Sequence, residues 1–92
     1  MTYIAKIESV NRTEGEVTLV VELPLWDKLM EHVSEWDGRI HTHGYVLGEY
    51  TIGCYRITIP AWQLHRFAAC TLTEQVEYWL MYFSREEVEV QR

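Results

Sequence analysis

The chain has 92 residues, of which 48% are apolar and 13% aromatic, and fourteen acidic against eight basic residues give a net charge of −6. This composition excludes global disorder, and the length predicts a single domain over residues 1–92. The negative balance argues against direct binding to nucleic acid or to anionic membranes, because both need cationic surfaces.

The N-terminal segment and the cysteines predict the cellular compartment. Residues 1–6 turn polar almost at once, so no secretory signal is expected. No apolar run approaches the roughly 20 residues of a membrane span. Two cysteines, Cys54 and Cys70, are too few for a disulfide framework and indicate reduced, mostly buried thiols. We therefore expect a cytoplasmic protein.

The first part of the chain predicts a hairpin followed by a helix. Residues 3–10 and 16–23 are rich in Val, Ile and Tyr, and a polar connection with glycine joins them, as in a β-hairpin. Pro24 suits the first turn of a helix. Residues 25–36 then carry apolar side chains at helical spacing. This predicted stripe consists of Trp26, Leu29, Met30, Val33 and Trp36.

The second part predicts another strand pair, a helical region and a last strand. Residues 39–47 and 50–59 are β-like, and residues 61–70 predict a short helix. The Thr-Leu-Thr-Glu sequence at 71–74 is either a capping box for a following helix or a break within one long helix. The helical period then continues through Ser84, with a predicted core side of Val76, Trp79, Leu80 and Phe83. Residues 86–90 alternate like an edge strand with a charged outer face.

This order, ββαββαβ, predicts an α+β domain. Its closest common architecture is a ferredoxin-like sandwich with one extra strand, in which an antiparallel sheet packs on two helices. A fold of this kind does not by itself assign a function.

The best candidates for metal or acid–base chemistry are His41 and His43. Residues two apart in a strand share a face, so both imidazoles would meet one ion or act as an acid–base pair. A zinc site needs further ligands, for which His65, Cys54 and Cys70 are the candidates, but no short-spaced pair supplies them. Nucleophile motifs and Gly-rich phosphate loops are absent. We therefore predict no catalytic residue, metal or cofactor, with a small metal-binding or hydrolytic protein as an alternative.

The helix predicted over residues 25–36 carries acidic residues at every fourth position. The row consists of Asp27, Glu31 and Glu35. This spacing stacks the three carboxylates about 6 Å apart on one line, although like charges at i and i+4 slightly destabilise a helix. One interpretation is a solvated face softened by Lys28 and His32. The other is a row that imitates phosphates and occupies a basic groove.

The last helical segments contain more aromatic residues than one core face needs. If the inner side of each segment follows its apolar period, a second set of large side chains faces outward. This outer set consists of Trp62, Arg66, Tyr78, Met81 and Tyr82. Because these residue types are enriched in interface cores, we expect them to bind a partner unless another segment covers them. A homodimer would cover the same surface.

The acidic row and the outer aromatic set together predict a non-enzymatic protein-binding module that inhibits or regulates a protein partner by occluding it. Compact acidic domains without motifs suit inhibitors carried by phages and mobile elements, such as anti-CRISPR and other anti-defence proteins. The acidic row adds the hypothesis that the partner is a nucleic-acid-binding protein. A small-molecule-binding regulatory domain, using a Trp-lined space between sheet and helices, is a further alternative.

Overall fold

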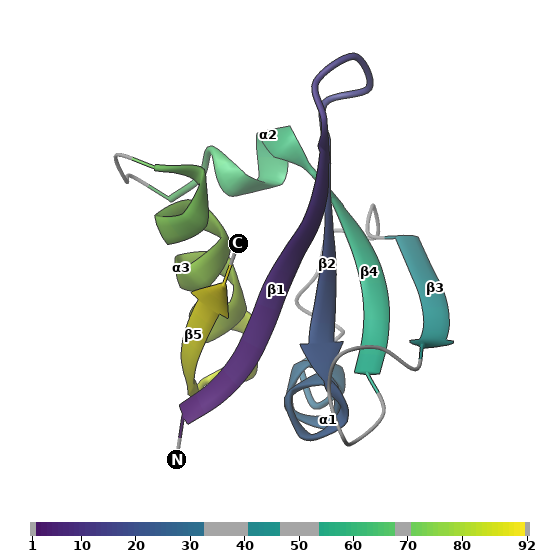
Figure 1. Cartoon of the computed structure of the whole chain (residues 1–92). Coiled ribbons are helices and arrows are strands. Elements are labelled where there is room, and N and C mark those ends of the chain that lie inside the picture. Colours follow the sequence, from purple (N-terminus) through teal and green to yellow (C-terminus); the bar gives the residue numbers. More distant parts are fainter. Residues whose placement is uncertain (1, 33–40, 47–53, 68–70, 92) are drawn as a thin grey trace.

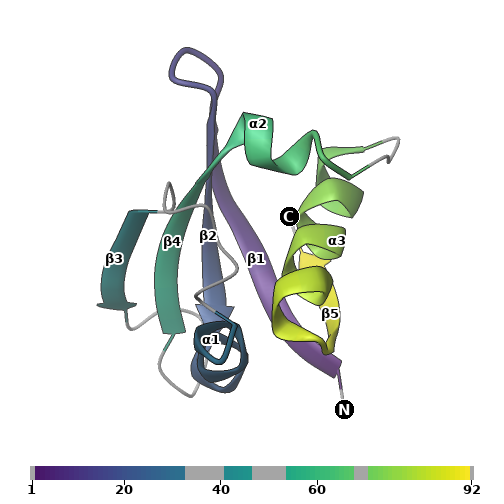
Figure 2. The same ribbon diagram turned by 180° about the vertical axis from the view of Figure 1, so that it is seen from behind.

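Five strands form one sheet, and three helices lie against one of its faces (Figures 1 and 2). The structure is a computed structural model that describes residues 2–32, 41–46 (backbone only), 54–67 and 71–91. In chain order the elements are β1 (Thr2–Asn11), β2 (Glu16–Glu22), α1 (Leu23–Met30), β3 (His41–Val46), β4 (Cys54–Pro60), α2 (Ala61–Leu64), α3 (Leu72–Ser84) and β5 (Glu87–Gln91). The α+β class predicted from the sequence is confirmed.

The strands follow the spatial order β3-β4-β2-β1-β5. Strands β1 and β2 form the predicted antiparallel hairpin, and β3 pairs antiparallel with β4 as predicted. Strand β4 pairs antiparallel with β2, whereas β5 runs parallel to β1, from the pair Thr2↔Glu87 to the pair Lys6↔Gln91. The prediction of an antiparallel sheet was therefore wrong, because the last strand makes the sheet mixed.

Both helical connections join strands that run in the same direction. Because β4 is antiparallel to both β2 and β3, those two strands are parallel, and α1 lies in the connection between them. By the same reasoning β4 and β5 are parallel, and α2 and α3 lie between them in the chain. The helices of both connections lie on the same face of the sheet (Figure 2).

The hairpin turn is held by a side chain, by a glycine and by the start of α2. The Asn11 side-chain oxygen accepts a hydrogen bond from the backbone N–H of Glu14 at 3.0 Å. Gly15 has a φ of 68°, in the left-handed region that residues with a Cβ disfavour. Its carbonyl accepts a 2.7 Å bond from the N–H of Ala61, which anchors the turn to α2.

Helix α1 is shorter than its apolar period suggested. It ends at Met30, with Glu31 as its C-cap, whereas the prediction extended it to residue 36; residues 33–36 lie outside the described residues. The buried side is centred between Leu25 and Leu29, so Met30 falls at its edge and is 42% exposed. The apolar spacing thus predicted which side of this helix is buried but not where the helix ends.

The region after β4 forms two helices rather than one. The Thr71 hydroxyl accepts a 3.1 Å bond from the N–H of Glu74 and donates a 3.1 Å bond to its carboxylate Oε1. This Thr71 cap, at the position where the sequence suggested a capping box, begins α3 as a new helix. The observed order is therefore ββαββααβ, and the predicted ββαββαβ was wrong at this point.

Replacing Thr71 by alanine should lower the free energy of unfolding by about 1 kcal/mol, because the N–H of Glu74 loses its acceptor. Urea denaturation followed by circular dichroism would measure the change. Thr71→Ser is the matched control, since it keeps the hydroxyl and should lose only a few tenths of a kcal/mol. Equal losses in both variants would contradict the capping role.

The hydrophobic core lies between the inner face of the sheet and the helices. Trp79 and Phe83 of α3 are its largest fully buried side chains, with ring centroids 4.7 Å apart. Trp26 of α1 stacks on Tyr55 of β4 with centroids 3.9 Å apart. The burial predicted for Trp26, Trp79 and Phe83 is confirmed, whereas Trp36, also predicted in the core, lies outside the described residues.

Candidate protein-interaction surface

Three large aromatic side chains on α2 and α3 are exposed. The exposed fraction is 50% for Trp62, 39% for Tyr78 and 46% for Tyr82. Tyr78 and Tyr82 are one turn apart on α3 and therefore share a face. Arg66, just after α2, is exposed as well, whereas Met81 is half-buried and packs against the core. The inner residues of α3 thus leave these two tyrosines outside, as the helical phase implies.

Tyr82 is held in place by aromatic and cationic neighbours. Its ring meets Phe67 edge-on at 5.8 Å and Phe83 edge-on at 4.9 Å between centroids. The Arg85 guanidinium lies 5.2 Å from the centroid of the same ring. These contacts join the segment after α2 to α3 and restrict the motion of an exposed aromatic ring.

A buried amide lies beneath this surface. Gln63 of α2 is 1% exposed; its Oε1 accepts a 3.3 Å bond from Arg66 Nη1, and its Nε2 has no hydrogen-bond partner among the described residues. The Arg66 guanidinium also lies 6.0 Å from the Phe83 ring centroid. Arg66, although exposed, thereby links Gln63 of α2 to Phe83 of α3.

The acidic row is only partly described. Asp27 lies on α1 and is exposed, Glu31 is the exposed C-cap of that helix, and Glu35 is outside the described residues. Lys28 Nζ lies 4.0 Å from a Glu31 carboxylate oxygen and 3.8 Å from one of Glu86. Such partly exposed ion pairs contribute at most about 1 kcal/mol. Lys28 nevertheless offsets some of the negative charge that the row presents.

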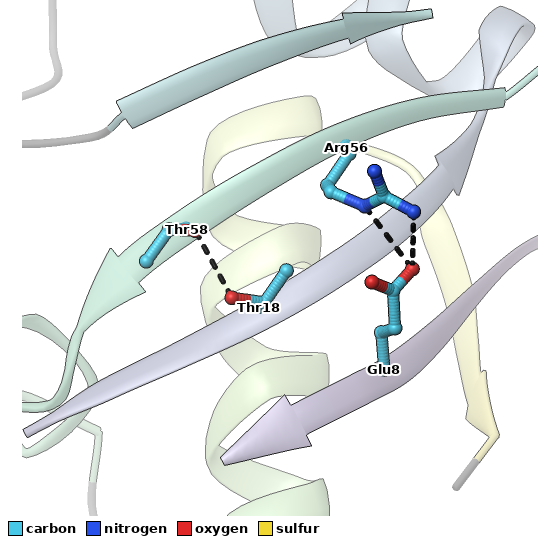
Figure 3. Close-up of polar contacts among 4 residues, drawn as sticks. All are labelled: Glu8, Thr18, Arg56 and Thr58. Atoms are coloured by element: carbon cyan, nitrogen blue, oxygen red, sulfur yellow. Dashed lines mark hydrogen bonds and ion pairs between the residues drawn. The ribbon is translucent and has the colours of Figure 1, made fainter. Parts of the chain in front are cut away.

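The face of the sheet opposite the helices carries a pair of opposite charges that the sequence patterns did not indicate (Figure 3). Arg56 of β4 reaches across β2 and donates from Nε and Nη2 to one oxygen of Glu8, at 3.2 and 3.0 Å. Next to it the hydroxyls of Thr18 and Thr58 are 3.0 Å apart. A register shift between Ile7 and Ser9 leaves Glu8 as the extra residue of a bulge in β1.

Strand alternation places further carboxylates on the same open face. Those on β2 and β5 are Glu16, Glu22, Glu87 and Glu89. Lys6 and Arg56 bring positive charge to this face. Among the described side chains of β1, β2, β4 and β5, they are the only ones that do so. The open face is thus acidic, like the exposed side of α1.

A bulge in β3 separates the two histidines that the sequence placed on one face of a strand. His41 pairs with Thr58 and Gly44 pairs with Arg56, so the register shift makes His43 the extra residue of a bulge. Simple alternation, which placed both histidines on one face, does not hold across such a bulge. Their side chains and Cys70 lie outside the described residues, while His65 is exposed after α2. In the described part of the chain no cluster of three metal-ligating side chains occurs.

Cys54 is a fully buried cysteine at the start of β4, directly opposite Glu22 of β2. Burial raises the pKa of its thiol, and the nearby Glu22 carboxylate raises it further. Both effects disfavour the thiolate, which is the nucleophilic and metal-binding form. The described environment of Cys54 is therefore that of a structural thiol.

We expect the Cys54 thiol to react with iodoacetamide much more slowly in the folded than in the urea-unfolded chain, at about pH 8. A Cys70→Ser background isolates the reaction, and mass spectrometry measures it. Since the folded state binds the thiol proton more tightly, stability should fall as pH rises through the ordinary thiol pKa. The Cys54→Ser variant should lack that alkaline fall. Equal alkylation rates would contradict this assignment.

The space between sheet and helices does not form a Trp-lined ligand site in the described part of the chain. Trp26 and Trp79 are buried there against Tyr55 and Phe83. A depression of about 420 Å³ lies elsewhere, at the end of the hairpin. It is lined by Val10, Asn11, Arg12, Gly15, Glu16, Val17, Ala61 and Leu72. No observation on these residues favours a small-molecule function over a protein partner.

Comparisons of this chain with protein-family models, with curated proteins and with solved structures found no match. Among the described helices, none has the length and hydropathy of a membrane span.

Proposed function

We propose that this chain is a non-enzymatic protein-binding module that inhibits or regulates a protein partner by occluding it. The observation that carries the proposal is the exposure of Trp62, Tyr78 and Tyr82 on two adjoining helices. Large aromatic side chains are normally used to fill the core of so short a chain, and they dominate the binding energy of protein interfaces. Arg66 and Met81 border this surface and belong to the same class of interface residues.

We further propose that the partner is a nucleic-acid-binding protein, with the carboxylates of Asp27, Glu31 and Glu35 occupying its basic groove. The exposure of Asp27 and Glu31 and the net charge of −6 support this mode. An inhibitor of this kind suits a phage or another mobile element, such as an anti-CRISPR or other anti-defence protein, acting in the cytoplasm.

For the fold, we propose a ferredoxin-like arrangement with β1 as the inserted strand. Without β1, the remaining strands would follow the order β3-β4-β2-β5, with each helical connection joining two parallel strands around a third. This arrangement agrees with a split βαβ pattern. It bears on function only by leaving the outer side of α3 and the open sheet face available to partners.

The proposed function is tested by affinity capture from host extract with tagged variants. The wild type and Arg12→Ala should retain the same partner, because Arg12 is an exposed side chain of the hairpin, outside both the aromatic surface and the acidic row. The double variant Trp62→Ala/Tyr82→Ala should lose at least about tenfold in affinity for that partner, as expected for interface hot spots. A partner bound equally by all three proteins would refute the assignment of this surface.

Charge reversal tests the mimicry separately. Asp27→Lys/Glu31→Lys should weaken partner binding most at low salt, because screening reduces the effect of exposed charges. Thr13→Lys/Glu14→Lys is the control, because both side chains are exposed in the hairpin turn, away from α1 and from the open sheet face, and the change in net charge is similar, three instead of four units. Binding that is unaffected by the α1 reversal at low and moderate salt would refute the mimicry.

A further inference from the structure

We propose that the aromatic surface of α2 and α3 binds an acidic segment of the protein partner, in which one side-chain carboxylate pairs with Arg66. A neighbouring aromatic or aliphatic side chain of that segment packs beside the exposed rings of this surface, which are those of Trp62, Tyr78 and Tyr82. This assignment rests on the proposed function only in that the surface is an interaction site. It concerns a segment of the partner other than the basic groove assigned to the carboxylates of α1.

Arg66 is an exposed cation whose charge no described carboxylate offsets within 4.0 Å. Its Nη1 donates to the side-chain oxygen of Gln63 at 3.3 Å, and its guanidinium lies 6.0 Å from the Phe83 ring centroid, so neither contact brings a negative charge. By contrast, the Lys28 ammonium lies 4.0 and 3.8 Å from two carboxylate oxygens, and the Arg56 guanidinium lies 3.0 Å from one. In the described part of the chain, Arg66 thus keeps its full charge beside exposed aromatic rings.

The amide of Gln63 is an independent observation that an acceptor belongs at this place. Gln63 is 1% exposed, and its Nε2 has no hydrogen-bond partner among the described residues. A buried donor of this kind is unfavourable, because it has lost its bonds to water without replacing them. Since Oε1 and Nε2 belong to one amide group, Nε2 lies within about 6 Å of Arg66 Nη1. Two donors are therefore close together where the chain supplies no anion.

A carboxylate is the group that fits these two donors. Its two oxygens accept several hydrogen bonds, and the planar guanidinium matches its geometry. With charge-assisted bonds of about 2.7–2.9 Å, one carboxylate reaches both Arg66 and the Gln63 amide. Because the amide is covered in the unliganded chain, the second bond requires a small movement of the exposed guanidinium beside it. A neutral carbonyl offers a single acceptor and leaves the charge of Arg66 uncompensated.

The local extent of the positive charge favours a peptide segment over a nucleic acid. The chain as a whole carries a net charge of −6, and at physiological ionic strength charges farther apart than about 8 Å are largely screened. A segment with one or two carboxylates at Arg66 meets mainly the nearby cation. A nucleic acid extends its phosphates over the acidic parts of the surface as well, which is unfavourable.

The exposed rings supply the apolar part of the same site. Phe67 directly follows Arg66, and its ring meets that of Tyr82 edge-on at 5.8 Å between centroids. Trp62, four residues before Arg66, is 50% exposed. A partner side chain packed against these rings excludes water from the ion pair, which strengthens the attraction between the two charges. The carboxylate contact and the apolar contact therefore reinforce each other.

Selection from a phage-displayed library of random dodecapeptides, on the purified wild type and on Arg66→Gln in parallel, tests the inference. Peptides retained by the wild type should combine Asp or Glu with a nearby Trp, Phe, Tyr or Leu. Peptides retained by Arg66→Gln should keep the apolar residues and lose the enrichment in acids. Arg12→Gln is the matched control, because it removes an exposed arginine of the hairpin with the same change in net charge and should select like the wild type.

A matched pair of peptides then measures the charge contact directly. The most enriched peptide and its version with glutamine in place of the acidic residue are labelled with fluorescein, and anisotropy gives their affinities. The wild type should bind the glutamine version about three- to tenfold more weakly at low salt, and high salt should reduce the difference. Arg66→Gln should bind both peptides alike, with circular dichroism verifying its fold. The side-chain amide resonances of Gln63 should shift with the acidic peptide and not with its glutamine version.

Several results would overturn the inference. They are the absence of any enriched peptide, the selection of basic or uncharged peptides, and equal affinity of the wild type for both members of the pair. The last result does not depend on the folding of any variant. Failure of the proposed function is a different outcome: a host partner lost by Trp62→Ala/Tyr82→Ala but kept by Arg66→Gln leaves that function standing and removes only the carboxylate contact.

Discussion

Replacing Trp79 by alanine should lower the free energy of unfolding by about 3–5 kcal/mol, as truncation of a buried aromatic residue typically does. Trp79 is fully buried in the middle of α3, and its ring packs against Phe83 at 4.7 Å. Removing it leaves a cavity between α3 and the sheet that the rigid strands cannot close. Since a domain of this size is stable by only about 5–15 kcal/mol, the loss is a large part of the total.

Trp62→Ala is the matched control for this prediction. It removes the same side chain from the adjoining helix, at a position that is half exposed, and should change stability by no more than about 0.5 kcal/mol. Urea denaturation of both variants, followed by far-ultraviolet circular dichroism, gives the comparison. Similar losses at the two positions would mean that Trp62 belongs to the core rather than to the interaction surface.

Replacing Trp26 by alanine should cost a similar amount, about 3–5 kcal/mol, for a different reason. Helix α1 has only eight residues and is held to the sheet by Leu25, Trp26 and Leu29. Trp26 stacks on Tyr55 at 3.9 Å with the ring planes inclined by 7°, so one side chain connects α1 to β4. Loss of this contact should loosen α1 as well as lower the stability of the whole domain.

A double-mutant cycle isolates the stack itself. The single variants Trp26→Ala and Tyr55→Ala and the double variant should give a coupling energy of about 0.5–1.5 kcal/mol, the usual range for an aromatic pair. Trp26→Phe should keep part of the coupling, because its smaller ring still reaches Tyr55. Additive single effects would show that the two rings contribute independently.

Local patterns were sufficient for most of the secondary structure but not for its long-range pairing. The alternation in β2 and the helical period of α3 depend on residues only a few positions apart, and both elements were predicted close to their observed bounds. The alternation of Val88 and Val90 in β5 is the same whether the neighbouring strand runs parallel or antiparallel. Its direction follows from the helical connection across the sheet, which no local period encodes.

The outward-facing side chains of α3 were predictable, because helical phase determines their direction. The charged pair on the open sheet face was not, because it depends on a bulge. Because Trp79 and Phe83 define the inner side of α3, the outward position of Tyr78 and Tyr82 followed directly from the sequence. The pairing of Glu8 with Arg56 was missed, since the bulge in β1 that carries Glu8 leaves no clear trace in the amino-acid pattern. The sequence signal nearest to this acidic face was the alternation of glutamates in the last strand.

The parallel pairing of β1 with β5 delays completion of the sheet during protein synthesis, because the two strands lie far apart in the chain. Thr2 contacts Glu87, which is 85 positions later in the chain. At a synthesis rate of about 5–20 residues per second, β1 waits roughly 4 to 17 s for its outer neighbour. Its hairpin with β2 forms long before that, so in the interval β1 is an open sheet edge able to pair with another nascent chain. Of the described strands, β5 is thus the one that covers the outer edge of β1.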